Sequence, residues 1–412
     1  MTKSFHENLR QYAEVALSVG LNLQPDQGLF IRAPIEAAEL VEEVKRVAGR
    51  LGCSHITEWQ EDVHVRHNYL MGLSSDLGGE EQSWQAMNRA AESGDALLAI
   101  KTEHPGLMKD VDPKRLEEYQ KSYSSGITSA RKITQADRTN WLVICAASPG
   151  WAADIFPGEE PDVRLDLLWN SIFQASRVDH PDPVKSWREH NDLLQRRVRI
   201  LNGLGLASLK LTSEGTDLTV GLVDGHIWKG GQTQTIDERK IPFHANIPTE
   251  EVYTMPHRGK VDGDVSATRP LVYKGVELED FSFRFDGGRV VQIKAKKRDK
   301  QIIKDMINTD EGASRLGEVG LADETSPLAR MGLIFKTTLL DENAATHLAL
   351  GGSYPGTVRD GADISEAEYL SRGGNLSEIH EDFMVGSNTM NIDGETIENQ
   401  KTPLMRNGTW VI

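Results

Sequence analysis

Hydrophobic positions in the first half of the chain follow a helical period. Apolar residues spaced by three and four positions lie on one face of a helix, and this period is clearest in two segments. The apolar positions are Leu40, Val44, Val47 and Leu51 in the first segment and Trp187, Leu194, Val198 and Leu201 in the second. The glycines at positions 52 and 203 predict where these two helices end.

Short apolar runs alternate with the helical segments. They cover residues 28–32, 96–100 and 141–145. Short runs that are apolar throughout and separated by helices are typical of buried parallel strands. The pattern predicts that residues 1–190 form an N-terminal α/β domain with an open sheet.

The second half has a period of two instead. Residues 216–222 alternate between apolar and polar positions, and the runs 281–285 and 290–294 flank Asp286-Gly-Gly288, which is a hairpin signal. One helical segment intervenes, around residues 302–307. Residues 191–412 are therefore expected to form a β-rich α+β domain, and the fold class of the whole chain is expected to be α/β.

Length and charge narrow the classes of function. A chain of 412 residues exceeds one small core, which agrees with two domains. Lys and Arg number 46 against 62 Asp and Glu, which gives a net charge of -16. An acidic surface repels phosphate backbones and anionic headgroups, so neither nucleic acid nor a membrane is expected as a partner.

Cysteine usage and the chain start point to the cytoplasm. Cys53 and Cys145 are the only cysteines, too few for a disulfide framework, and no CxxC motif occurs. Residues 1–10 lack the pattern of a signal peptide, and the most apolar stretch, residues 141–147, is far shorter than a membrane span. A cytoplasmic protein is therefore predicted.

Five candidate metal ligands lie in the β-rich half: Glu251, Glu318, His347, His380 and Asp382. Three carboxylates and two imidazoles form a mixed oxygen and nitrogen set. Such a set suits one or two divalent cations such as zinc, cobalt or manganese. No GxSxG, P-loop or HExxH motif offers a competing chemistry.

Local sequence around these residues supports a site. Residues 379–385 alternate, so His380 and Asp382 share one face of the predicted strand. Glycines on both sides of Glu318 allow close approach of a neighbouring backbone. Of the adjacent acids Glu250 and Glu251, one can bind a cation while the other serves as a general base, and the pattern leaves open which does which.

With these segments the chain resembles the thermophilic aminopeptidase family, the dinuclear metallo-aminopeptidases of the aminopeptidase T and aminopeptidase S type. Five stretches carry the resemblance in order and approximate spacing: residues 215–218, 246–252, 316–319, 347–354 and 377–382. It covers essentially the whole chain.

The resemblance implies an enzyme that removes the N-terminal residue from peptides. It implies two divalent ions held by the five candidate ligands, with Glu318 as the bridge between them. It also implies Glu250 as the general base, Tyr354 as a group that stabilises the transition state, and a homodimer. Two other functions remain open: a non-catalytic metal-dependent binding protein on the same scaffold, and a metal-dependent amidohydrolase for non-peptide amides.

Overall fold

The computed structural model describes residues 3–61, 66, 78–104, 107, 111–112, 122–123, 125–273, 276–361 and 363–412. The chain forms two compact units. The first contains residues 1–191 and 232–248, and the second contains residues 192–231 and 249–412.

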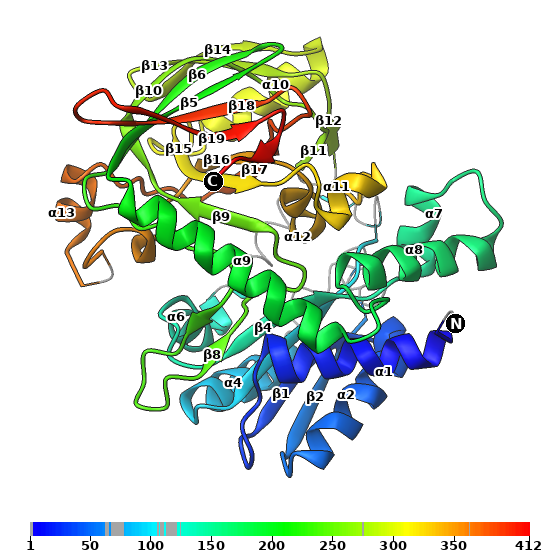
Figure 1. The fold of residues 1–412 in the computed structure, drawn as a ribbon. Helices are drawn as coiled ribbons and strands as arrows, with labels where there is room; N and C mark the ends of the chain where they lie inside the picture. Colours follow the sequence, from blue (N-terminus) through cyan, green and yellow to red (C-terminus); the bar gives the residue numbers. More distant parts are fainter. Residues whose placement is uncertain are drawn as a thin grey trace. The chain divides into compact units, whose positions relative to one another are not determined.

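A parallel four-stranded sheet of order β2-β1-β3-β4 forms the centre of the first unit (Figure 1). Its strands are β1 (Leu29–Pro34), β2 (His55–Gln60), β3 (Ala96–Lys101) and β4 (Trp141–Cys145). Three of them coincide with the apolar runs of the sequence, which confirms the predicted open α/β layer. The helices of this unit are α1 (Phe5–Val15), α2 (Ala38–Arg50), α4 (Gly78–Glu92), α6 (Thr128–Gln135), α7 (Pro149–Ile155) and α8 (Pro161–Ala175).

Helix boundaries in this unit follow local sequence. In α2 the predicted positions Leu40, Val44 and Val47 are buried on one face. The side chain of Ser148 caps α7 by accepting a hydrogen bond from the backbone N–H of Trp151. The second predicted helix is α9 (Pro183–Gly203), which begins in the first unit, continues into the second and ends at the predicted residue.

Segments of the two units alternate along the chain. The predicted boundary is a single cut between residues 190 and 191, whereas residues 232–248 return to the first unit. Backbone hydrogen bonds explain this return, because Val143 of β4 donates to Ala245 and accepts from Ile247, and His244 donates to Gly20. These long-range backbone pairings leave no signal in a local sequence pattern.

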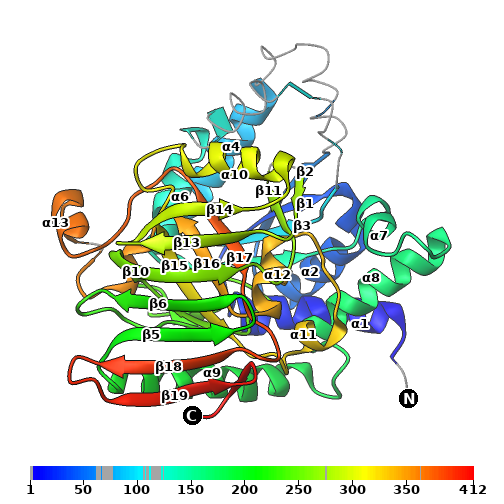
Figure 2. The same cartoon turned by 90° about the horizontal axis from the view of Figure 1, so that it is seen from above.

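Two antiparallel sheets form the second unit (Figures 1 and 2). The larger has the order β14-β13-β10-β6-β5-β18-β19-β20, and the smaller has the order β17-β16-β15-β9. The strands of the larger sheet are β5 (Leu206–Ser213), β6 (Thr216–Leu222), β10 (Pro256–Ser266), β13 (Ser282–Asp286), β14 (Arg289–Lys294), β18 (Asn391–Thr396), β19 (Lys401–Arg406) and β20 (Thr409–Trp410). The strands of the smaller sheet are β9 (Glu251–Thr254), β15 (Leu316–Ala322), β16 (His347–Gly351) and β17 (His380–Met384).

The predicted hairpin and helix of this half are present. β13 and β14 pair through a turn in which Gly287 and Gly288 have φ of 55° and 78°, values that favour glycine. The intervening helix is α10 (Lys297–Ile307). Shorter elements are α11 (Pro327–Met331), α12 (Thr338–Asp341), α13 (Glu366–Ser371) and the two-stranded ribbon of β11 (Leu271–Tyr273) and β12 (Val276–Leu278).

One face of the smaller sheet packs into the hydrophobic core of the second unit. Val252, Val319, Leu348 and Phe383, one from each strand, belong to the same buried cluster as Phe283 of the larger sheet. Side chains alternate along a strand, so on each strand the residues next to these four project from the opposite face of the sheet. That opposite face carries the candidate ligands.

No helix among the described residues is long and apolar enough to cross a membrane.

Candidate metal centre

The register of the smaller sheet gathers the candidate ligands on one face. Gly320 of β15 lies opposite His347 of β16, and Glu318 and Asp382 both lie opposite Ala349. Residues opposite one another on neighbouring strands point to the same face. Glu251 of β9, opposite Ala322, points to that same face because Ala322 is an even number of residues from Glu318.

Short distances join these side chains. His347 Nε2 lies 3.0 Å from Glu251 Oε2 and 3.7 Å from Glu318 Oε1. His380 Nε2 lies 3.5 Å from Glu318 Oε2 and 3.7 Å from Asp382 Oδ1. Ligand atoms of Glu251, Glu318 and His347 all lie within 4.8 Å of one another. Glu318 thus offers one oxygen to each imidazole, which is the geometry that a bridging carboxylate needs.

Backbone carbonyls orient both imidazoles. His380 Nδ1 lies 2.7 Å from the carbonyl oxygen of Gly352, and His347 Nδ1 lies 3.2 Å from that of Ala345. A carbonyl oxygen only accepts hydrogen bonds, so Nδ1 carries the proton in each ring. Nε2 then faces the carboxylates, as is usual for metal-binding histidines.

Small residues on this face leave room for the cluster. A Cβ atom on Gly320 would lie 2.2 Å from His347 Nε2 and 2.6 Å from Glu251 Oε2. A Cβ atom on Gly317 would lie 2.3 Å from the carbonyl oxygen of Gly352. The close approach of a neighbouring backbone, predicted for the glycines beside Glu318, is therefore confirmed at Gly317, whereas at Gly320 the near atoms belong to side chains of the cluster.

Gly320→Ala should weaken metal binding on the order of 10–100-fold, the usual cost of disturbing the groups that support a metal ligand. The added methyl displaces His347 Nε2 and Glu251 Oε2 together. Gly49→Ala is the matched control, because a Cβ atom at Gly49 in α2 meets nothing within 4 Å. Metal affinity measured by competition with a chelator distinguishes the two variants. Equal affinities in Gly320→Ala and the unmodified protein would contradict the geometry.

The centre has a strongly negative electrostatic field. Burial alone would lower the pKa of His347, but Glu251 and Glu318 raise it well above its usual value. Burial raises the pKa of Glu318, and the neighbouring Glu251 and Asp382 add to this effect. The acids oppose one another's ionisation, and the imidazoles beside them retain a proton. A bound cation would therefore be stabilised at this position.

The carboxylate of Glu251 supplies an independent test of the fit to a metal. Its Oε2 atom is buried and faces His347 Nε2 at 3.0 Å. The neighbouring acids keep a proton on this nitrogen, which donates to the carboxylate. A divalent cation can take the place of that proton between the two atoms, so the residues present fit such an ion.

The two residues of the adjacent acid pair have different surroundings. Glu251 is in the cluster, whereas Glu250 lies just before β9 and its backbone N–H donates to Asn343 at 2.7 Å. The Glu250 carboxylate interacts electrostatically with Arg197 of α9, which is also bonded to Asp323 at 3.2 Å. The structure therefore brings Glu251 together with the other candidate ligands.

Tyr354 lies beside the cluster. Its ring is 4.7 Å from the His380 imidazole and 6.4 Å from the Tyr253 ring, and 49% of the residue is exposed. Partial desolvation and the negative charges of Glu318 and Asp382 raise the pKa of Tyr354 above its usual value. The phenol therefore keeps its proton and can donate a hydrogen bond beside His380.

Glu342 is an acid that the sequence analysis missed. It begins the short helical turn Glu342–Ala344 that leads to β16. Burial and the negative charges of Asp382 and Glu251 raise its pKa well above the usual value, so its carboxylate belongs to the same field. No motif marks Glu342 in the sequence; its position five residues before His347 is the one available signal.

The chain as a whole is similar to known proteins. The family model of the thermophilic metalloproteases (M29) matches residues 5–410. The chain belongs to this family. Membership confirms the predicted resemblance and the predicted class of enzyme, a metal-dependent hydrolase of peptide bonds.

Curated M29 relatives match over the full length of the chain. "Aminopeptidase 2" of Geobacillus stearothermophilus is 40% identical and covers 98% of both chains. "Aminopeptidase T" of Thermus aquaticus is 39% identical and covers 99% of this chain and 100% of the relative. The solved structure of wild-type AmpT from Thermus thermophilus has a TM-score of 0.92 at 36% identity and covers 99% of this chain and 100% of that one. The predicted fold class is therefore confirmed.

Proposed function

We propose that this M29 protein is an aminopeptidase that releases the N-terminal residue of peptides at a centre of two divalent ions. The observation that carries the proposal is the contact of Glu318 with both His347 and His380. One carboxylate shared by two imidazoles suits two ions side by side.

In this proposal the five predicted residues are the ligands of the two ions, with Glu318 as the bridge. Glu251 and His347 lie on one side of Glu318, and His380 and Asp382 lie on the other. Zinc, cobalt and manganese all accept such mixed oxygen and nitrogen ligands. When bound, two such ions lower the pKa of water and polarise the scissile carbonyl.

The chain itself must supply a base and a donor. Tyr354 keeps its proton beside His380 and is proposed to donate a hydrogen bond to the oxyanion that develops on the substrate. Glu250 is proposed as the base, and its carboxylate interacts electrostatically with Arg197. Glu342 is the rival for this role, because its buried carboxylate is close enough to Asp382 and Glu251 to feel their negative charges.

The negative electrostatic field of the neighbouring acids offers a reason for cleavage from the N-terminus. A free α-amino group is cationic and is attracted to a buried cluster of acids, whereas an acetylated one is neutral. The negative field would place the first residue of the peptide at the centre. This argument separates an aminopeptidase from an enzyme that cuts internal bonds.

An aminoacyl anilide with a free amine should be hydrolysed by the metal-loaded protein, and its N-acetyl form should resist. Release of the anilide chromophore measures both rates in one assay. Equal cleavage of both forms, or cleavage of blocked peptides at internal bonds, would overturn the proposal. Activity confined to non-peptide amides would favour the amidohydrolase instead.

We also propose that the protein is a homodimer, as the resemblance to the family implies. Light scattering at micromolar concentration should then give about twice the chain mass of 45.7 kDa. A mass near that of one chain would contradict the dimer without affecting the proposed chemistry.

A further inference from the structure

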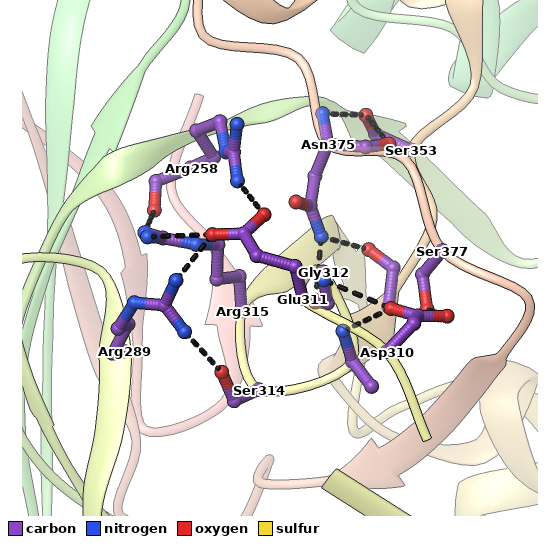
Figure 3. Close-up of polar contacts among 12 residues, drawn as sticks. Arg258, Arg289, Asp310, Glu311, Gly312, Ser314, Arg315, Ser353, Asn375 and Ser377 are labelled. Carbon is purple, nitrogen blue, oxygen red and sulfur yellow. Dashed lines mark hydrogen bonds and ion pairs between the residues drawn. The ribbon is translucent and has the colours of Figure 1, made fainter. Parts of the chain in front are cut away.

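The segment that delivers His380 is held from outside the metal centre. Residues 375–379 precede β17 and contact the loop of residues 310–313 that follows α10 (Figure 3). The two backbones touch, because a Cβ atom on Gly312 would lie 1.9 Å from the carbonyl oxygen of Leu376. Neither stretch contains a proposed ligand.

Asp310 makes the principal polar connection between the loop and this segment. Its Oδ2 accepts hydrogen bonds from the backbone N–H of Glu378 at 2.7 Å and from the hydroxyl of Ser377 at 2.9 Å. Its Oδ1 accepts from the backbone N–H groups of Gly312 at 2.8 Å and Ala313 at 2.9 Å. One carboxylate therefore organises its own loop with one oxygen and holds the other segment with the second (Figure 3).

The connection continues directly to His380. The carbonyl oxygen of Ile379 accepts from the backbone N–H of Gly352 at 2.8 Å, and the carbonyl oxygen of Gly352 accepts from His380 Nδ1 at 2.7 Å. Asn375 reinforces the link, because its Nδ2 donates to Gly312 O at 2.8 Å and to Gly351 O at 2.7 Å. The position of the His380 ring therefore depends on where residues 375–379 lie.

Glu311, the next residue, has different partners. Its carboxylate pairs with Arg258 of β10, Arg289 of β14 and Arg315 just before β15 (Figure 3). These arginines cross-link strands of the second unit and do not contact residues 375–379 through Glu311. Neighbouring acids of one loop thus have separable tasks.

We propose that Asp310 is a positioning residue of the metal centre, which fixes residues 377–379 so that Nε2 of His380 faces Glu318 and Asp382. The inference rests on the proposed metal-binding role of His380. Asp310 itself touches neither metal nor substrate. Its carboxylate acts through the backbone of Glu378 and the carbonyl of Gly352, which set the direction of the imidazole.

Asp310→Asn tests this role selectively. The asparagine keeps Oδ1 for the N–H groups of Gly312 and Ala313, so the loop can retain its own turn. Its amide nitrogen cannot accept from the N–H of Glu378, so that bond is lost, and toward Ser377 the amide can only donate. Glu311→Gln is the matched control: it neutralises the adjacent acid, removes three ion pairs and leaves this connection intact.

Each protein is titrated with cobalt while the visible absorption spectrum and the affinity against a competing chelator are recorded. In Asp310→Asn we expect affinity for one ion to fall on the order of 10–100-fold and its absorption bands to shift, with the circular dichroism spectrum unchanged. In Glu311→Gln we expect a lower melting temperature with unchanged cobalt bands and affinity. Ser377→Ala, which removes one of the two bonds, should shift the bands in the same direction by less.

Unaltered cobalt affinity and bands in both Asp310→Asn and Ser377→Ala would overturn the proposal. Equal changes in Asp310→Asn and Glu311→Gln would also overturn it, because they would reveal a general effect of loop stability. Failure of the unmodified protein to bind cobalt would instead refute the proposed metal centre itself, and this inference with it. The titration of the unmodified protein therefore separates the two failures.

Discussion

Glu318→Gln should remove metal and peptide hydrolysis together. Among the described residues, Glu318 is the one acid within 3.7 Å of both His347 and His380, and a neutral amide is a poor ligand for a dication. The loss in affinity should exceed the 10–100-fold that outer partners of a metal typically contribute. Metal analysis after gel filtration, beside the rate of aminoacyl anilide cleavage, measures both effects.

Glu378→Gln provides the control for this change. Glu378 lies two residues before His380, and its side chain is exposed. The same change from glutamate to glutamine can therefore be made near the cluster without removing a proposed ligand. The control should keep its metal and its rate. Normal metal content in Glu318→Gln would show that this carboxylate does not bridge the ions.

Three further glutamine variants should separate base from ligand. If Glu250 is the base, Glu250→Gln lowers the turnover rate by roughly 10²–10⁴-fold, the usual contribution of a positioned acid or base, and keeps the metal. Glu251→Gln should lose metal as well as rate, because Glu251 Oε2 lies 3.0 Å from His347 Nε2. Glu342→Gln tests the rival, since a fall in rate at full metal content in this variant alone would assign the base to Glu342.

The outcome decides between specific mechanisms. Loss of metal in Glu250→Gln but not in Glu251→Gln would reverse the roles of the pair. Full activity and full metal content in all three variants would place the base elsewhere and refute the proposed proton transfer. Arg197→Met is a companion to these variants, because it removes the cation that interacts electrostatically with Glu250.

Periodicity predicted those elements whose pattern is local. The helical spacing of Leu40, Val44 and Val47 identified α2, and the alternation of residues 379–385 correctly placed His380 and Asp382 on one face of β17. In both cases burial on one side of a single element determines the pattern, so a short window contains the information.

Local hydrophobic periodicity could not predict features that depend on strand register. Gly320 lies opposite His347 because β15 and β16 pair in one register, and this pairing joins residues far apart in the chain. Glu342 approaches the cluster through a short helical turn that has no periodic signal. The return of residues 232–248 to the first unit depends equally on long-range backbone bonds.

The central claim is that the cluster on the smaller sheet binds two divalent ions and that these ions are required for cleavage from the N-terminus. The most direct test is to prepare metal-free protein, add zinc or cobalt in steps, and measure bound metal and anilide release at each step. The account predicts no turnover without metal and a maximal rate at about two ions per chain. Full turnover in the metal-free protein would contradict the claim.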